Sequence, residues 1–230
     1  MIRLMWRLVR ALVTVLVLGG ALYLGGPYLR THAGRYLITQ DPLVKADMAL
    51  VLSGQPYLRV PEAARLYHER LIPKIPLVNE PRPPGQEDLL RLGTRYPDGL
   101  EISLPLLEAL RVPREAVLTI PERADSLQAE ADMVSRFLSG RSARALIIVT
   151  SKAQTTRARK ILAATLGPKV GLVMHSVSAD PFDPGRWWKN RPDFRQTVWE
   201  YAALVDLWRR GLWRAVVGEA TPAPPAVTVS

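Results

Sequence analysis

Short apolar runs alternate with segments of helical periodicity along most of the chain. The apolar runs typical of buried strands are 46–53, 74–79, 116–120, 145–150 and 170–177. The run Ala145–Thr150 is the clearest, because continuous apolar residues are typical of a strand covered on both faces. Helical spacing is found over 60–70, 104–110, 126–138, 153–166 and 193–213. This alternation predicts an α/β fold with a doubly wound, mostly parallel, Rossmann-like sheet.

Proline and glycine positions refine this prediction. Pro76 lies inside the second apolar run and favours an edge strand or a bulge, since proline has no N–H to donate to a sheet. Residues 81–100 contain four prolines and three glycines, so we expect an irregular insertion over the surface. The proline-rich residues after Thr221 predict a disordered tail.

The N-terminal region reads as a membrane anchor. Ala11–Leu29 forms 19 consecutive uncharged residues, a length that suits the hydrocarbon core of a bilayer. Arg3, Arg7 and Arg10 precede this run, and a positive flank tends to remain in the cytoplasm. We therefore expect one transmembrane helix in the cytoplasmic membrane, with the domain on the extracytoplasmic side. A cleaved signal peptide and a buried core helix are the alternatives.

These patterns divide the chain into four parts. We expect a cytoplasmic tip and anchor over 1–30, a linker over 31–44, the Rossmann-like domain over 45–214 and a disordered tail over 215–230. The lipid bilayer is the first partner that this organisation implies.

The composition narrows the classes of partner and chemistry. The net charge is +10, and arginine supplies 25 of the 31 basic residues. Anionic lipid headgroups or a solvated surface explain this charge. No basic run interleaved with aromatic residues is present, nor any zinc-finger or RNP signature, so no nucleic acid is expected. The absence of cysteine excludes disulfides, thiol nucleophiles and thiolate metal sites.

Signatures of common catalytic classes are missing. The sequence has no G-x-G-x-x-G or Walker A motif and no G-x-S-x-G elbow. His32, His68 and His175 are scattered without ligand spacing, so no metal site is expected. The residues alone predict neither a catalytic group nor a cofactor.

Candidate ligand-binding residues follow the predicted strands. In parallel sheets, ligands bind beyond the carboxyl ends of the strands. Ser53-Gly54 and Thr150-Ser151 both stand at such ends, and each precedes a helix whose free N–H groups suit an anion. Arg59 and Arg157 lie near the starts of those helices and would clamp a phosphate or carboxylate. Ordinary turns, helix caps and surface arginines are the alternative interpretation.

A third candidate lies at the start of the helix over 126–138. Asp125 or Ser126 is a suitable N-cap, and Glu130 stands in the first turn. Two acidic side chains there suit cation binding or proton transfer, although acids in a first turn also complement the helix dipole.

The order and spacing of these motifs resembles the YdcF/SanA/ElyC-like family of bacterial Rossmann-like domains. The resemblance covers about residues 45–210. It rests on Ala46-Asp47, Ser53-Gly54, Arg59, Ala63, Leu66, Tyr67, Thr150, Ser151, Gln154, Arg157 and Ala158. Gln154 stands where the family has histidine, and Asn79-Glu80 stands where it has Ser-Gly. Glu130 is one position away from a family glutamate. If the family site performs acid–base chemistry, these departures imply its loss here.

The resemblance implies an envelope-biogenesis factor acting in peptidoglycan or lipid-carrier metabolism. It would bind a phosphorylated or lipid-linked anionic ligand through Ser53, Gly54, Arg59, Ser126, Glu130, Thr150, Ser151, Gln154 and Arg157. One alternative is a catalytically inactive adaptor of envelope-synthesis proteins. Another is a transferase that binds a nucleotide or S-adenosylmethionine, or a phosphatase-like hydrolase.

Overall fold

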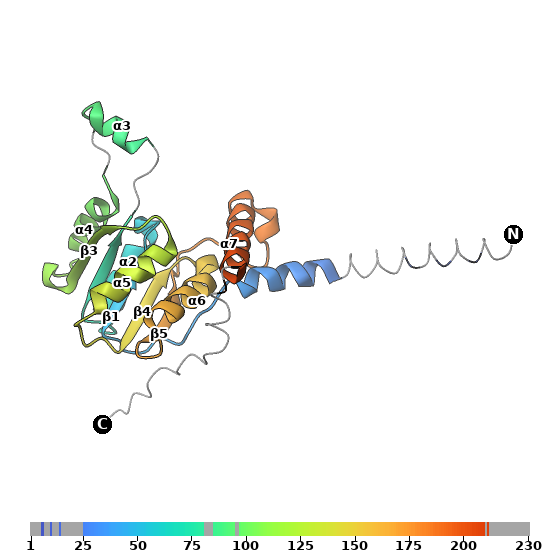
Figure 1. Cartoon of the computed structure of the whole chain (residues 1–230), viewed down its shortest axis with the longest axis horizontal. Coiled ribbons are helices and arrows are strands. Elements are labelled where there is room, and N and C mark those ends of the chain that lie inside the picture. Colours follow the sequence, from blue (N-terminus) through green and yellow to red (C-terminus); the bar gives the residue numbers. More distant parts are fainter. Residues whose placement is uncertain are drawn as a thin grey trace, which may run out of the picture.

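The computed structural model describes residues 6, 10, 14, 25–80, 85–94, 97–209 and 211 of the 230-residue chain. Its centre is a single five-stranded sheet, parallel throughout, with the strand order β3-β2-β1-β4-β5 (Figure 1). The strands are β1 (Met48–Val51), β2 (Ile75–Asn79), β3 (Val117–Arg123), β4 (Ala145–Thr150) and β5 (Gly171–Ser176). The α/β class and the parallel sheet expected from the sequence are confirmed.

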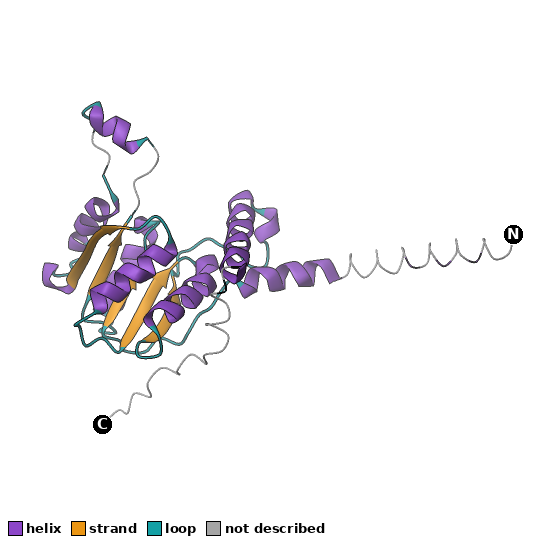
Figure 2. Ribbon diagram, in the orientation of Figure 1, coloured by secondary structure: helices purple, strands orange, loops and turns teal. Residues whose placement is uncertain are grey.

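Helices cover both faces of this sheet (Figure 2). They are α2 (Pro56–His68), α3 (Gln86–Arg91), α4 (Gly99–Ala109), α5 (Leu127–Leu138), α6 (Thr155–Leu166) and α7 (Arg191–Arg209), together with the 3₁₀ turns η1 (Arg114–Ala116), η2 (Lys152–Gln154) and η3 (Trp187–Lys189). Residues 25–36 form a further helix ahead of β1.

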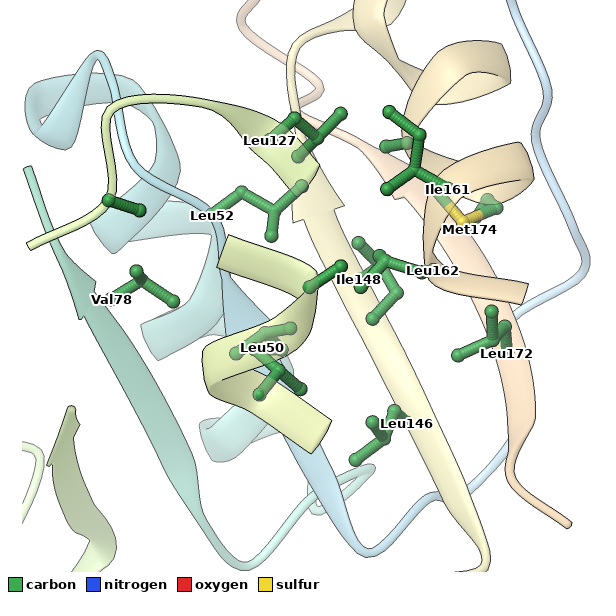
Figure 3. Close-up of a cluster of buried hydrophobic side chains, with 14 of the residues drawn as sticks. Leu50, Leu52, Val78, Leu127, Leu146, Ile148, Ile161, Leu162, Leu172 and Met174 are labelled. Atoms are coloured by element: carbon green, nitrogen blue, oxygen red, sulfur yellow. The ribbon is translucent and has the colours of Figure 1, made fainter. Parts of the chain in front are cut away.

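Two hydrophobic clusters lie on the two faces of the sheet because successive strand side chains point in opposite directions. Ala49 and Val51 of β1 pack with α2 and α4. Leu50 packs on the other face with α5 and α6, where Figure 3 shows it in the same cluster as Ile148 and Leu162. Every residue of β4 is buried, as its continuous apolar sequence predicts.

Prolines account for the main differences from the predicted elements. β2 lies between β3 and β1, so the edge position predicted from Pro76 is wrong. The register shift in β2 comes instead at Val78/Asn79. α2 begins at Pro56 and continues through Pro61. α4 begins at Gly99, five residues earlier than predicted, behind a capping box formed by Asp98 and Glu101.

The segment predicted as a linker is part of the packed fold. Leu37 is 1% exposed. The Asp41 carboxylate accepts a hydrogen bond from the Met174 N–H in β5 at 2.8 Å and pairs with Arg159 of α6 at 3.0 Å. These contacts fix residues 37–41 along α6 and β5, so the domain begins before residue 45.

The helix over residues 25–36 contacts α7 and η3. The Tyr201 hydroxyl donates to the Ala33 carbonyl at 2.9 Å, and the Trp187 indole N–H donates to the Arg30 carbonyl at 2.8 Å. A Cβ on Gly34 would lie 2.7 Å from Trp187 Cδ1, so only glycine permits this approach. Among the residues that the structure describes, no helix is both long and apolar enough to cross a bilayer. Most of the predicted anchor and all of the predicted tail lie outside those residues.

Candidate functional site

The sheet order reverses between β1 and β4, which makes their carboxyl ends a topological switch point. The chain leaves β1 for β2 on one side and later reaches β4 on the other. Val51 is in register with Val149, so the segments that follow the two strands are neighbours. Doubly wound sheets bind their ligands at this location. Ser53-Gly54 follows β1 there, and Ser151 follows β4.

The guanidinium of Arg59 spans this switch point. Its Nη1 donates to the Leu52 carbonyl at 3.0 Å and also to the Ser53 carbonyl. Its Nη2 donates to Ser151 Oγ at 2.9 Å and to Gln154 Oε1 at 2.8 Å. Arg59 is 3% exposed, and this burial lowers its pKa to about 10 against the opposing attraction of Glu130 and other carboxylates. In the described state Arg59 joins two strand ends and is engaged within the chain.

The Ser53-Gly54 turn presents two backbone N–H groups, and both hold a carboxylate of the protein. The Ser53 N–H donates to Glu130 Oε1 at 2.9 Å, and the Gly54 N–H donates to Glu80 Oε1 at 2.8 Å. Gly54 has a φ of +97°, a conformation that glycine adopts at little cost. The two N–H groups of the turn thus bind oxyanions, and two glutamates of the protein supply them.

The two glutamates differ in their surroundings. Glu130 is 2% exposed, and burial raises its pKa although Ser53, Arg59 and Arg157 favour its charged form. Glu80 is partly exposed and follows directly after β2. Its side chain rests against Gly99, where a Cβ would lie 2.7 Å from Glu80 Cγ. Glu80 is therefore the more accessible of the two carboxylates that the turn holds.

Gln154, the last residue of η2, lies beside the Arg59 guanidinium. Its amide oxygen accepts from Arg59 and, at 3.0 Å, from the Thr150 hydroxyl. Ser151 Oγ also lies 3.3 Å from Gln55 Oε1. An amide oxygen remains an acceptor at any pH, which keeps Arg59 bound in one position.

Arg157 forms a two-pronged ion pair with Glu200 of α7. Its Nε lies 2.6 Å from Glu200 Oε2, and its Nη2 lies 3.0 Å from Oε1. Both side chains are largely buried, so this pair ties α6 to α7. Arg157 still borders a cleft of about 140 Å³ between α5, α6 and α7, together with Ser126.

Ser126 stands apart from the Arg59 network. It is the N-cap of α5 and accepts from the Ala129 N–H at 3.2 Å. The structure thus brings most of the predicted residues together around Arg59, whereas Ser126 caps α5 and lines the cleft that Arg157 borders. The predicted residues found around Arg59 are Ser53, Gly54, Glu130, Thr150, Ser151 and Gln154, and Arg157 lies beside them.

Four side chains near this network were not among the predicted site residues: Gln55, Glu80, Asp180 and Glu200. Glu80 directly follows a strand, which is the signal that identifies it. The Asp180 carboxylate accepts from the Lys152 N–H at 2.7 Å, in a loop that no sequence pattern marks. Among the described residues, no three histidine or acidic side chains are grouped to hold a metal ion.

Comparison with known proteins adds no assignment, since no protein-family model and no curated protein matches the sequence.

Proposed function

We propose that this protein is a membrane-anchored envelope-biogenesis factor that binds a phosphorylated or lipid-linked anionic ligand at the carboxyl edge of its sheet. One observation carries the proposal: the Ser53 and Gly54 N–H groups each hold a carboxylate oxygen at ordinary hydrogen-bond length. A phosphate or carboxylate of a ligand has the same acceptor geometry. In the proposed bound state, the ligand replaces Glu80 on the Gly54 N–H.

Glu80 is the group that the ligand would displace. Glu130 is buried and faces both arginines, whereas Glu80 is partly exposed at the end of β2. Departure of Glu80 also removes one of the negative charges that act on Arg59. A multiply charged ligand would then meet a turn with an open donor and a nearby guanidinium.

The predicted anchor supports the lipid-linked part of the proposal. An uncharged run of 19 residues ends at Leu29, shortly before the helix contacts α7. A tether raises the effective concentration of ligands held in the same bilayer. The motif resemblance supports a role in peptidoglycan or lipid-carrier metabolism.

Native mass spectrometry of the detergent-solubilised full-length protein tests this function. We expect a co-purifying phospholipid, polyprenyl phosphate or nucleotide, and we expect more of it on Glu80→Ala. In calorimetric titrations with pyrophosphate, Glu80→Ala should bind about tenfold more tightly than the unmodified chain, a change of about 1.4 kcal/mol. Glu122→Ala is the matched control, since Glu122 is an exposed glutamate on β3.

Gly54→Ala should reduce pyrophosphate binding in both backgrounds, because its φ of +97° strains any side chain there. Circular dichroism confirms that each variant is folded. If pyrophosphate affinity is the same in Glu80→Ala and in the control, the turn is not an anion site and the proposal fails.

A second candidate is a catalytically inactive adaptor of envelope-synthesis proteins. The observation that favours it is the placement of Arg59, whose guanidinium contacts lie within the chain, beside a glutamine whose side chain cannot take up or release a proton near neutral pH. An adaptor would capture the same membrane-protein partners with the unmodified chain and with Gly54→Ala, and neither would hold a phosphorylated ligand.

A further inference from the structure

The solvent-facing side of α7 carries a continuous apolar stripe. Phe194, Val198, Val205 and Trp208 recur at spacings that place them on one helix face. Trp199 is also exposed, but it is turned about 100° around the helix from Val198. These five side chains are between 49% and 68% exposed. The buried face of α7 includes Leu204 and Leu207, which directly precede the stripe residues Val205 and Trp208 in the sequence. The stripe therefore adds a second apolar face to a helix whose first face already packs on the domain.

We call this apolar row the α7 stripe. Exposed basic residues lie on α7 itself and on the two segments that contact it, η3 and the helix over residues 25–36. They are Arg30, Arg35, Lys189, Arg191, Arg195 and Arg209. The acidic residues of α7 are differently placed: Asp193 and Glu200 are buried, and Asp206 pairs with Arg209 at 2.9 Å. Exposed tryptophan flanked by arginine is typical of surfaces at the boundary between lipid and water. The charge is complementary to anionic lipid headgroups.

The N-terminal helix brings this surface close to the end of the predicted anchor. The uncharged run ends at Leu29, and the contacts with η3 and α7 follow at Arg30 and Ala33. Four residues of helix span about 6 Å, which is comparable to the depth of one headgroup layer. Figure 1 shows α7 at the edge of the molecule from which this helix projects.

Aromatic contacts fix the relative position of the helix and this edge. Tyr36 stacks on Tyr201 with ring centroids 6.2 Å apart, and the Arg30 guanidinium lies 4.9 Å from the centroid of Trp188. Gly34 allows the close approach to η3. The helix that leads from the anchor is thereby held against the element that bears the stripe.

We propose that the α7 stripe lies in the headgroup region of an anionic bilayer, so that the domain docks on the membrane surface as well as being tethered to it. This inference rests on the anchor in the proposed function and adds an orientation to it. The cleft lined by Ser126, Arg157 and Leu207 then opens beside the docked helix, where the polar part of a lipid-linked molecule would be within reach.

The chain has no cysteine, so single cysteines can report the position of α7 in the full-length protein. Val205→Cys and Val198→Cys place a label on the stripe. Ser142→Cys is the control, because Ser142 is exposed in the turn before β4, at the opposite end of that strand from η2 and α7. Each variant is labelled with an environment-sensitive fluorophore and reconstituted into vesicles of phosphatidylglycerol and phosphatidylethanolamine.

Spin-labelled lipids should quench the labels at 198 and 205 at least about twofold more than the label at 142. The vesicles are also washed with sodium carbonate, which removes proteins that do not span the bilayer. Equal, weak quenching at all three positions in protein that resists this extraction would overturn the docking proposal and leave the anchor intact. Protein that carbonate extracts from the vesicles would instead contradict the anchor. A Val205→Cys label that is shielded from water but not quenched by lipid, together with disulfide-linked dimers of the unlabelled Val205→Cys protein, would identify a second copy as the occupant and also overturn the proposal.

Discussion

Arg59 combines burial with a permanent charge, and its hydrogen bonds explain how the fold tolerates that combination. The guanidinium donates to two backbone carbonyls in the segment after β1 and to two side-chain oxygens in the segment after β4. Its Nε has no partner among the described residues. A buried charge that loses a partner is costly, since water does not replace the lost contact.

Gln154→Ala should therefore destabilise the domain by about 1–3 kcal/mol, because it removes an acceptor from a buried guanidinium. Urea denaturation followed by circular dichroism measures this change. Gln128→Ala is the control, since the Gln128 side chain bonds Asp132 and Thr165 nearer the surface and should cost under about 0.5 kcal/mol. Equal effects of the two substitutions would show that Gln154 does not support Arg59.

The lowered pKa of the Glu62 carboxylate predicts that the fold becomes less stable at low pH. Burial alone would raise its pKa, but hydrogen bonds from His175 at 2.8 Å, from Arg65 and from the Ser178 N–H outweigh burial and lower the pKa to about 2. A carboxylate with a depressed folded-state pKa stabilises the fold above its unfolded pKa. That stabilisation is lost as the pH falls from about 4.5 towards 2.

Denaturation midpoints of the unmodified chain and of Glu62→Gln, measured from pH 6 to pH 2.5, test this assignment. The unmodified chain should be more stable at pH 6, and the difference should shrink steadily below about pH 4.5. A difference that stays constant over this range would mean that the Glu62 charge does not contribute.

The candidate site divides into a part that the sequence predicts and a part that it does not. Carboxyl ends of parallel strands meet at one edge, so the grouping of Ser53, Arg59 and Ser151 follows from recognising the strands. Their partners come from distant segments: Glu80 is 26 residues from Gly54, and Glu200 is 43 residues from Arg157. Local patterns carry no information on such pairs. For this reason nothing in the sequence indicates that Arg59 and Arg157 have partners within the chain.

At the scale of elements, local chemistry decided how well each boundary was predicted. Ser126, one of the two caps predicted for α5, is its N-cap, and the predicted and observed limits of the helix agree closely. α2 and α4 contain Pro61 and Pro105 in their interiors, where proline normally interrupts a helix. Packing of buried residues such as Val60 and Leu107 on the sheet overrides that local preference.

Ser126→Ala should lower stability by about 1 kcal/mol, since it leaves the Ala129 N–H at the start of α5 without its acceptor. Ser126→Asp should retain most of the stability, because aspartate is an equally good cap. Thermal or urea unfolding distinguishes the two. If alanine and aspartate behave alike, the Ser126 side chain is not acting as a cap.

At the scale of the whole molecule, the apolar periodicity predicts the fold class but not the order of the strands. Every apolar run suits a buried parallel strand, so the pairing of β1 with both β2 and β4 depends on helix packing over the two faces. The role of residues 37–41 was missed for a related reason. Their contacts with α6 and β5 come from a segment without helical or strand periodicity.

Ile148→Ala should destabilise the domain by about 2–5 kcal/mol, because Ile148 is fully buried between β1, α5 and α6. Val205→Ala is a useful contrast, since Val205 is 61% exposed and should change stability by less than about 0.5 kcal/mol. Chemical denaturation of the full-length chain in detergent gives both values. A large effect of Val205→Ala in the absence of lipid would indicate that the α7 stripe packs within the protein.

The position of β1 at the centre of the sheet has a consequence for timing. Asp47, the residue before β1, and Ala145, the first residue of β4, bond to each other across 98 positions of sequence. A ribosome that adds about 5–20 residues per second needs roughly 5–20 s to make the intervening chain. During that interval one edge of β1 has no strand to pair with, and the sheet forms only once most of the polypeptide exists. A chain delivered across a membrane as it is made would therefore cross unfolded, and the domain would assemble on the far side.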